Sequence, residues 1–185
     1  MNSTRRSLLR MGAMGSLAFV VGNKTLMLTP AQARAQNIPF QVLSDKHALT
    51  LHHVAELTLP GSTEAGVVHF IDQQLSRPAD ECLLMIRYLG IEAPYREFYL
   101  NALVGFEVSA QQMFGANFHA LERTQAQELF NQATRGDPSG WQGPPAPFFL
   151  FVLRADASDV LYGTQAGSEA LSIPYMAHIE PSTNW

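Results

Sequence analysis

Apolar residues at helical spacing, in stretches that end at proline or glycine, constrain the fold of this chain more than any other feature. In the first stretch, from Ser44 to Leu59, alanine and leucine side chains recur three or four positions apart, as on one face of a helix. Ser44 supplies the capping oxygen, and Pro60-Gly61 ends the helix. No part of the chain shows the regular alternation of apolar and polar residues that is typical of a strand, so we expect an all-α protein.

Five further helices follow from the same pattern of caps, apolar stripes and breakers. The last one begins with a strongly apolar run that would also suit a buried strand, but its length and the polar residues in its second half favour a helix. These features predict a small single-domain helical bundle of about six helices, with an extended C-terminal tail. The five expected ranges are 62–75, 79–89, 94–115, 124–134 and 148–162.

Two aromatic segments lie outside the expected helices. Trp141 lies in a loop over residues 136–147 that is rich in glycine and proline, and the tail from Leu171 to Trp185 is apolar but interrupted by prolines. Such a tail must lie on some surface. It either covers the chain's own helices or faces a partner, where aromatic side chains make the best anchors.

The N-terminus has the pattern of a bacterial export signal. Arg5 and Arg6 are followed by leucines at 8 and 9 (Leu8, Leu9) and by a short apolar run over residues 11–21. An ordinary secretory leader also begins with positive charge, but the paired arginines favour the twin-arginine (Tat) type, which carries folded proteins. A membrane-spanning helix needs roughly 20 apolar residues, about twice this run. Two small-x-small cleavage sites overlap, one at residues 31–33 and one at residues 33–35 (Ala33, Ala35). We favour cleavage after residue 35, which leaves residues 36–185 as the domain.

Removal of residues 1–35 would leave an acidic protein. Five of the 12 basic residues and none of the 16 acidic residues lie in that segment, so the remaining chain has 7 basic and 16 acidic side chains, a formal charge of −9. Such a domain repels phosphate groups, which argues against nucleic acid and anionic lipid surfaces as partners. Cys82 is the one cysteine, so no intramolecular disulfide can form. We expect it to be buried, with an intermolecular bridge as the alternative.

Motifs for metal or cofactor chemistry are weak or missing. His52-His53-x-x-Glu56 and His119-x-x-Glu122 each place two metal-ligating side chains on one helical face. Helical di-iron sites use more carboxylates and the opposite order, so solvated or capping roles are the default. The sequence has no glycine-rich nucleotide loop, no haem-attachment motif and no nucleophile elbow. We therefore expect no catalytic, cofactor or metal residues in this chain, and an exported helical domain without a cofactor points to an accessory subunit.

Three stretches resemble the gluconate 2-dehydrogenase subunit 3 family, the small subunit of exported flavin-dependent sugar and alcohol dehydrogenases. Together with the leader they span nearly the whole chain. They are LPGSTEAGVVHFID at 59–72, the stretch at 99–134 in which a Phe-Gly turn joins two expected helices, and DVLYG at 159–163 followed by LSIPY at 171–175.

The resemblance implies a periplasmic complex of three parts. A large subunit of the glucose-methanol-choline (GMC) oxidoreductase type would hold FAD and oxidise a sugar, polyol or sugar acid such as gluconate, and a multihaem cytochrome c would carry haem c and pass electrons on to membrane quinone. The small subunit would carry the signal that the Tat translocase reads for both proteins, and it would act as a chaperone for the large one. The family places no catalytic residue in this subunit.

An escort of this kind needs a persistent interface with an aromatic centre. The candidates are Trp141, Tyr162, Tyr175, Met176 and Trp185, for each of which packing in the chain's own core is the alternative. Two other classes remain open, namely an independent metal-dependent enzyme built on the histidine and glutamate pairs and a periplasmic protein that binds a small ligand.

Overall fold

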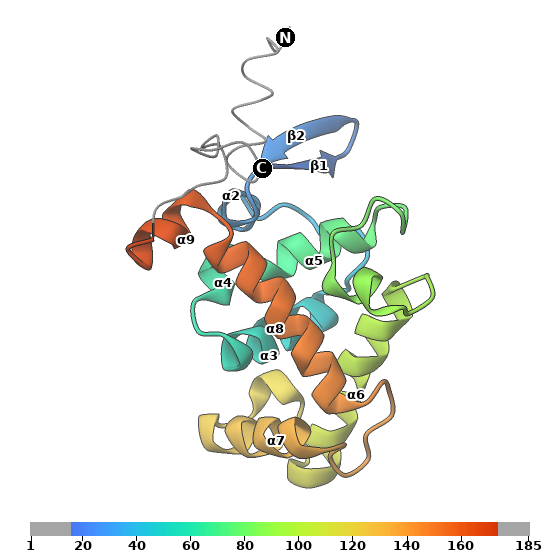
Figure 1. The fold of residues 1–185 in the computed structure, drawn as a ribbon. Helices are drawn as coiled ribbons and strands as arrows, with labels where there is room; N and C mark the ends of the chain where they lie inside the picture. Colours follow the sequence, from blue (N-terminus) through green and yellow to red (C-terminus); the bar gives the residue numbers. More distant parts are fainter. Residues whose placement is uncertain (1–15, 174–185) are drawn as a thin grey trace, which may run out of the picture.

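The computed structural model describes residues 16–173, and this part of the chain is mainly helical (Figure 1). The predicted all-α class is confirmed. The described residues form eight α-helices, two 3-10 helices and one two-stranded sheet. The elements are β1 (Leu17–Val21), β2 (Lys24–Leu28), α2 (Pro30–Ala35), α3 (Asp45–Thr58), α4 (Ser62–Ala65), α5 (Val67–Leu75), η1 (Met85–Leu89), α6 (Arg96–Phe114), η2 (Phe118–Ala120), α7 (Arg123–Arg135), α8 (Ala146–Tyr162) and α9 (Gln165–Ala170).

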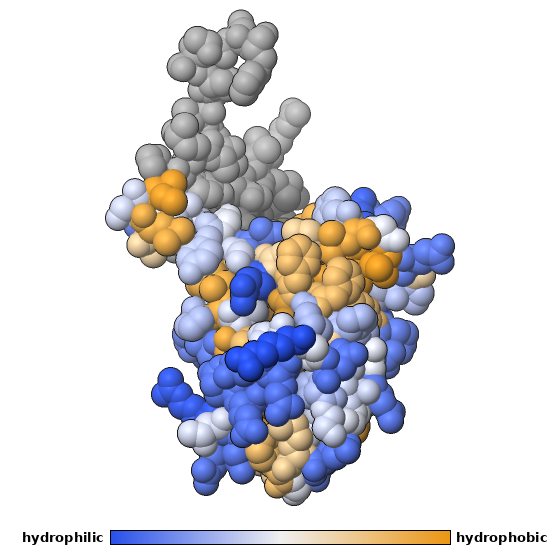
Figure 2. All heavy atoms as spheres, turned by 60° about the horizontal axis from the view of Figure 1, so that its bottom comes forward, coloured by the Kyte–Doolittle hydropathy of each residue, from blue (hydrophilic) through white to orange (hydrophobic). Residues whose placement is uncertain are grey.

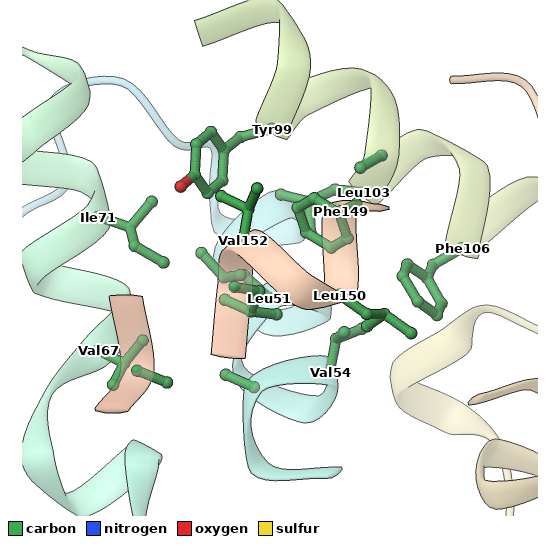
Figure 3. Packing of buried hydrophobic residues seen from close by; sticks show 14 of the residues in the cluster. Leu51, Val54, Val67, Ile71, Tyr99, Leu103, Phe106, Phe149, Leu150 and Val152 are labelled. Carbon is green, nitrogen blue, oxygen red and sulfur yellow. The ribbon is translucent and has the colours of Figure 1, made fainter. Parts of the chain in front are cut away.

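Helix α8 crosses the body of the molecule and packs against most of the other helices (Figure 1). Its inner face meets α3, α5 and α6 in one continuous hydrophobic core (Figure 3). Leu51, Ile71, Phe106 and Phe149 from these four helices are all fully buried. Each such side chain contributes roughly 1.5–3 kcal/mol by leaving water, so this core holds the helices together.

Two of the expected helices differ in the structure. The range 62–75 is divided into α4 and α5 at Gly66, which has a φ of 83°. The range 79–89 was predicted as a helix, but only η1, a 3-10 helix, forms there. Side chains from other helices explain the second difference. Leu83 and Met85 donate their backbone N–H groups to Gln74 and Asp156, at 2.7 Å in each case, rather than to carbonyls within a helix of their own.

The sequence did not predict the N-terminal hairpin or the two short helices α2 and α9. Strands β1 and β2 pair antiparallel, with Leu17 opposite Leu28 and Val21 opposite Lys24. Helix α2 follows at once, with Thr29 as its cap. Helix α9 ends at Ala170, just before the predicted C-terminal tail. Residues 174–185 of that tail lie outside the described part of the chain.

Three consecutive polar side chains in the C-terminal half of α5 organise the segments around it. Asp72, Gln73 and Gln74 are all at least 96% buried. Asp72 accepts the backbone N–H groups of residues 41–43 at 2.8–2.9 Å. Gln73 donates to the carbonyl of Ala18 in β1 at 3.1 Å, and Gln74 accepts from Leu83. One helix therefore holds the lead-in to α3, the hairpin and the loop before η1.

Within residues 16–173 no helix is both long enough and apolar enough to cross a membrane.

Candidate functional site

The first half of α8 is apolar on every side, yet one side of it is uncovered. Phe149, Leu150, Val152 and Leu153 point into the core, whereas Phe151 is 55% exposed. A helix that is apolar all round is normally buried all round. The outer face of α8 is therefore a surface that a partner could cover.

The same outer face ends in an aromatic residue. Ala155, Ser158 and Tyr162 follow Phe151 at intervals of three or four residues, so they share its face. Tyr162 is 37% exposed. Phe151 and Tyr162 lie eleven residues apart, about 16 Å along the helix axis.

A loop beside α8 adds further exposed apolar side chains. Within residues 83–91, Leu83, Tyr88, Leu89 and Ile91 are each between 36% and 63% exposed. The loop lies along α8 because Met85 donates its N–H to Oδ1 of Asp156 at 2.7 Å. Figure 2 shows hydrophobic side chains gathered in the upper part of one face of the molecule, above a mainly hydrophilic lower part. We call the exposed side chains of residues 83–91 together with Phe151 and Tyr162 the apolar face.

A surface cavity of about 520 Å³ opens beside the apolar face. Leu83 and Tyr88 form one side of it, and Asp159 and Val160 of α8 form another. The remaining wall comes from the N-terminal segment, with Leu17 and Pro30. The cavity is lined mainly by apolar atoms, so it suits an inserted apolar side chain of a partner.

The predicted interface residues separate into three groups. Tyr162 is exposed on the outer face of α8. Trp141 instead packs edge-on against Phe106, with ring centroids 5.1 Å apart, and donates its indole N–H to the carbonyl of Pro144 at 2.8 Å. It rests on α6 at Gly105, where a Cβ atom would lie 2.9 Å from the indole ring. Tyr175, Met176 and Trp185 lie outside the described residues, as do Arg5, Arg6, Leu8 and Leu9 of the leader.

A buried pair of ionisable side chains links the loop over residues 83–91 to the core. Asp156 of α8 is 1% exposed and accepts hydrogen bonds from Tyr99 Oη and the Met85 N–H. Burial raises the pKa of Asp156 to about 7, although both hydrogen bonds act to lower it. Burial, and then the adjacent Asp156, also raise the pKa of Tyr99 well above its usual value. These groups join α6, α8 and the loop over residues 83–91.

The predicted histidine and glutamate pairs do not assemble into a metal site in the described residues. No group of three histidine, cysteine, aspartate or glutamate side chains in residues 16–173 is arranged to hold a metal ion. Glu56 has a structural role instead, because its carboxylate accepts the N–H groups of Gly61 at 2.9 Å and Thr63 at 3.1 Å. Partial burial acts to raise the pKa of Glu56, but these hydrogen bonds outweigh it and lower the pKa.

The remaining members of these pairs make contacts of other kinds. The rings of His52 and His53 are tilted, with centroids 5.4 Å apart. Burial, followed by the charges of His52 and His119, lowers the pKa of His53. Glu122 caps α7 in a reciprocal pair of hydrogen bonds with Gln125.

Cys82 is buried, as expected. Its side chain is 1% exposed, its Sγ accepts the Leu84 N–H at 3.4 Å, and burial raises the pKa of the thiol. A protonated, buried thiol is a poor nucleophile.

Sequence reasoning missed Phe151 and the exposed residues of the 83–91 loop. The six consecutive apolar residues at 148–153 indicated a buried helix and gave no sign of which side would be left uncovered. The exposed loop residues were missed because residues 79–89 were predicted to form a helix.

The comparison with known proteins finds one family. A family model described as gluconate 2-dehydrogenase subunit 3 matches residues 45–177, which include every helix from α3 to α9. No curated protein and no solved structure matches the chain.

Proposed function

The chain belongs to the gluconate 2-dehydrogenase subunit 3 family, and from this premise we propose that it is the non-catalytic small subunit of a periplasmic FAD-dependent dehydrogenase. The large subunit would be of the GMC type and would oxidise a sugar, a polyol or gluconate. In this proposal the small subunit binds the flavoprotein in the cytoplasm, assists its folding and stability, and supplies the twin-arginine signal that exports both. A multihaem cytochrome c would then receive the electrons.

The observation that carries the proposal is the apolar face. A helix that is apolar on every side at its beginning, with Phe151 55% exposed, leaves apolar area in water unless a partner covers it. Stable interfaces bury about 800 Å² on each partner and have aromatic side chains at their centre. Phe151, Tyr88 and Tyr162 would supply that centre.

The division of chemistry between the two subunits is part of the same proposal. FAD and the groups that act on substrate would belong to the large subunit, and haem c to the cytochrome. The buried carboxylates of Asp72 and Asp156 have structural partners, because Asp72 accepts backbone N–H groups and Asp156 accepts from Tyr99 and Met85. The partly exposed Glu56 also accepts backbone N–H groups. These carboxylates stabilise the chain's own fold.

Co-purification tests the proposal. The full chain, carrying an affinity tag at its C-terminus, is produced together with the flavoprotein encoded beside it, and the purified material is examined by size-exclusion chromatography with light scattering. We expect one complex that contains both chains in equal number and shows flavin absorbance. Recovery of the tagged chain as a stable monomer, with the flavoprotein eluting separately and fully active, would contradict the proposal.

A further inference from the structure

The segment that the sequence marks as a removable leader is packed into the domain from Leu17 onward. We propose that the exported protein keeps residues 17–35, and that the leader is not cut after Ala35. The contacts of residues 17–35 with the helical body support this proposal. The export step rests on the proposed function, whereas the packing of this segment does not.

The hairpin and α2 form a second hydrophobic cluster. Phe19 of β1, Ala33 of α2 and Ile38 are 3%, 0% and 7% exposed, with partly buried side chains of β1 and β2 around them. A cut after Ala35 would remove Phe19 and Ala33 and leave Ile38 uncovered. Phe19, from the apolar stretch of the supposed leader, therefore has a place inside the domain.

Polar contacts tie the same segment to α4 and α5. Gln73, 3% exposed, donates to the Ala18 carbonyl at 3.1 Å, and this acceptor would be lost with the leader. Arg34 makes two hydrogen bonds to the carboxylate of Glu64, at 2.9 and 2.5 Å. A buried amide left without its acceptor costs about 1–3 kcal/mol, so the body of the protein is adapted to the presence of residues 17–35.

A glycine between α4 and α5 allows α2 to pack closely against the rest of the domain. Gly66 has a φ of +83°, and a Cβ atom there would lie 2.2 Å from the carbonyl oxygen of Pro30. The backbone of α2 thus packs directly on the junction between α4 and α5. Only glycine allows this approach.

The expected cleavage site lies at the end of a formed helix, although Ala35 and Gln36 on either side of the bond are exposed. Ala33 is fully buried, and the bond after Ala35 follows the last residue of α2, whose first turn is held by the reciprocal Thr29 and Gln32 hydrogen bonds. The twin-arginine route carries folded proteins, so this helix is formed before a peptidase could act. Leu17 and Pro30 also line the cavity beside the apolar face, so the retained segment would contribute to the partner surface.

The mass of the exported chain tests the inference. The full chain, tagged at its C-terminus, is co-produced with the flavoprotein and recovered from the periplasm for intact mass measurement and N-terminal sequencing. We expect a chain that begins at or before Leu17. A chain that begins at Gln36, or at any residue from 18 to 35, would overturn the inference.

A second measurement keeps the test independent of export, using full-length chain purified from the cytoplasm and brief digestion with trypsin. We expect the bond after Arg34 to resist cleavage in the native protein and to be cut at least tenfold faster in Gly66→Ala, which displaces α2. The matched control is Gly61→Ala, which also has a positive φ of +90° but whose Cβ would meet nothing closer than 3.8 Å. Rapid release of a fragment beginning at Ala35 from the native protein would refute the packing, even if the chain is never exported.

Discussion

The hydroxyl of Tyr99 in α6 donates a hydrogen bond to Oδ2 of Asp156 in α8, and both side chains are almost completely buried. The second carboxylate oxygen of Asp156 accepts the N–H of Met85, the first residue of η1. One buried carboxyl group therefore joins two core helices to the loop that carries much of the apolar face.

This arrangement gives stability an unusual dependence on pH. Burial raises the pKa of Asp156 to about 7, whereas an aspartate in the unfolded chain titrates near 3.9. The unfolded chain loses its proton first as pH rises, so the free energy of unfolding should fall between about pH 4 and pH 7. The contribution of this one group to that fall is roughly 4 kcal/mol at most.

The Asp156→Asn variant isolates this contribution, because an amide has the shape of the protonated acid and does not titrate. We expect the free energy of unfolding, from urea denaturation at a series of pH values, to depend less steeply on pH in the variant by about one proton. An unchanged pH dependence would show that Asp156 titrates normally in the folded protein.

The apolar face predicts a variant that loses the partner but keeps the fold. Phe151→Glu places a charge on the exposed side of α8, where a partner would have to desolvate it. We expect at least a tenfold loss in the amount of flavoprotein that co-purifies, with the free energy of unfolding changed by no more than about 1 kcal/mol. Val104→Glu is the matched control, since Val104 is 41% exposed on α6, away from this face, and should leave co-purification unchanged. An equal loss of co-purifying flavoprotein in both variants would show that the apolar face does not bind the flavoprotein.

Substitution of the buried Asp72 should strongly lower the free energy of unfolding. Its carboxylate accepts three backbone N–H groups at 2.8–2.9 Å and is 4% exposed, so Asp72→Ala would leave three amides without an acceptor. We expect the free energy of unfolding to fall by roughly 3–5 kcal/mol, measured by urea denaturation. Asp80→Ala, at an exposed position, should change it by less than about 0.5 kcal/mol. A loss below about 1 kcal/mol for Asp72→Ala would contradict this structural role.

Sequence reasoning succeeded where helix signals were local. The helix from Ser44 was bounded correctly to within a residue or two, because its cap and its Pro60-Gly61 end both lie next to it in the chain. The long helices α6, α7 and α8 were found for the same reason.

The failures involve features that the local sequence does not reveal. Residues 79–89 do not form an α-helix because Gln74 and Asp156 take the backbone N–H groups of Leu83 and Met85, and nothing in the local sequence announces those acceptors. The hairpin over residues 17–28 was not predicted, since its apolar residues also fit the pattern of a leader. Phe151 was missed because a uniformly apolar helix gives no sign of which side is left uncovered.

The central claim is that this chain exports a partner, and the most direct test is the double variant Arg5→Lys/Arg6→Lys, co-produced with the flavoprotein. Dye-linked dehydrogenase activity and the amount of each chain are measured in periplasm and cytoplasm, against the native pair. Our account predicts that the variant leaves both proteins and the activity in the cytoplasm. If the flavoprotein still reaches the periplasm while only this chain is held back, the shared-signal account is contradicted.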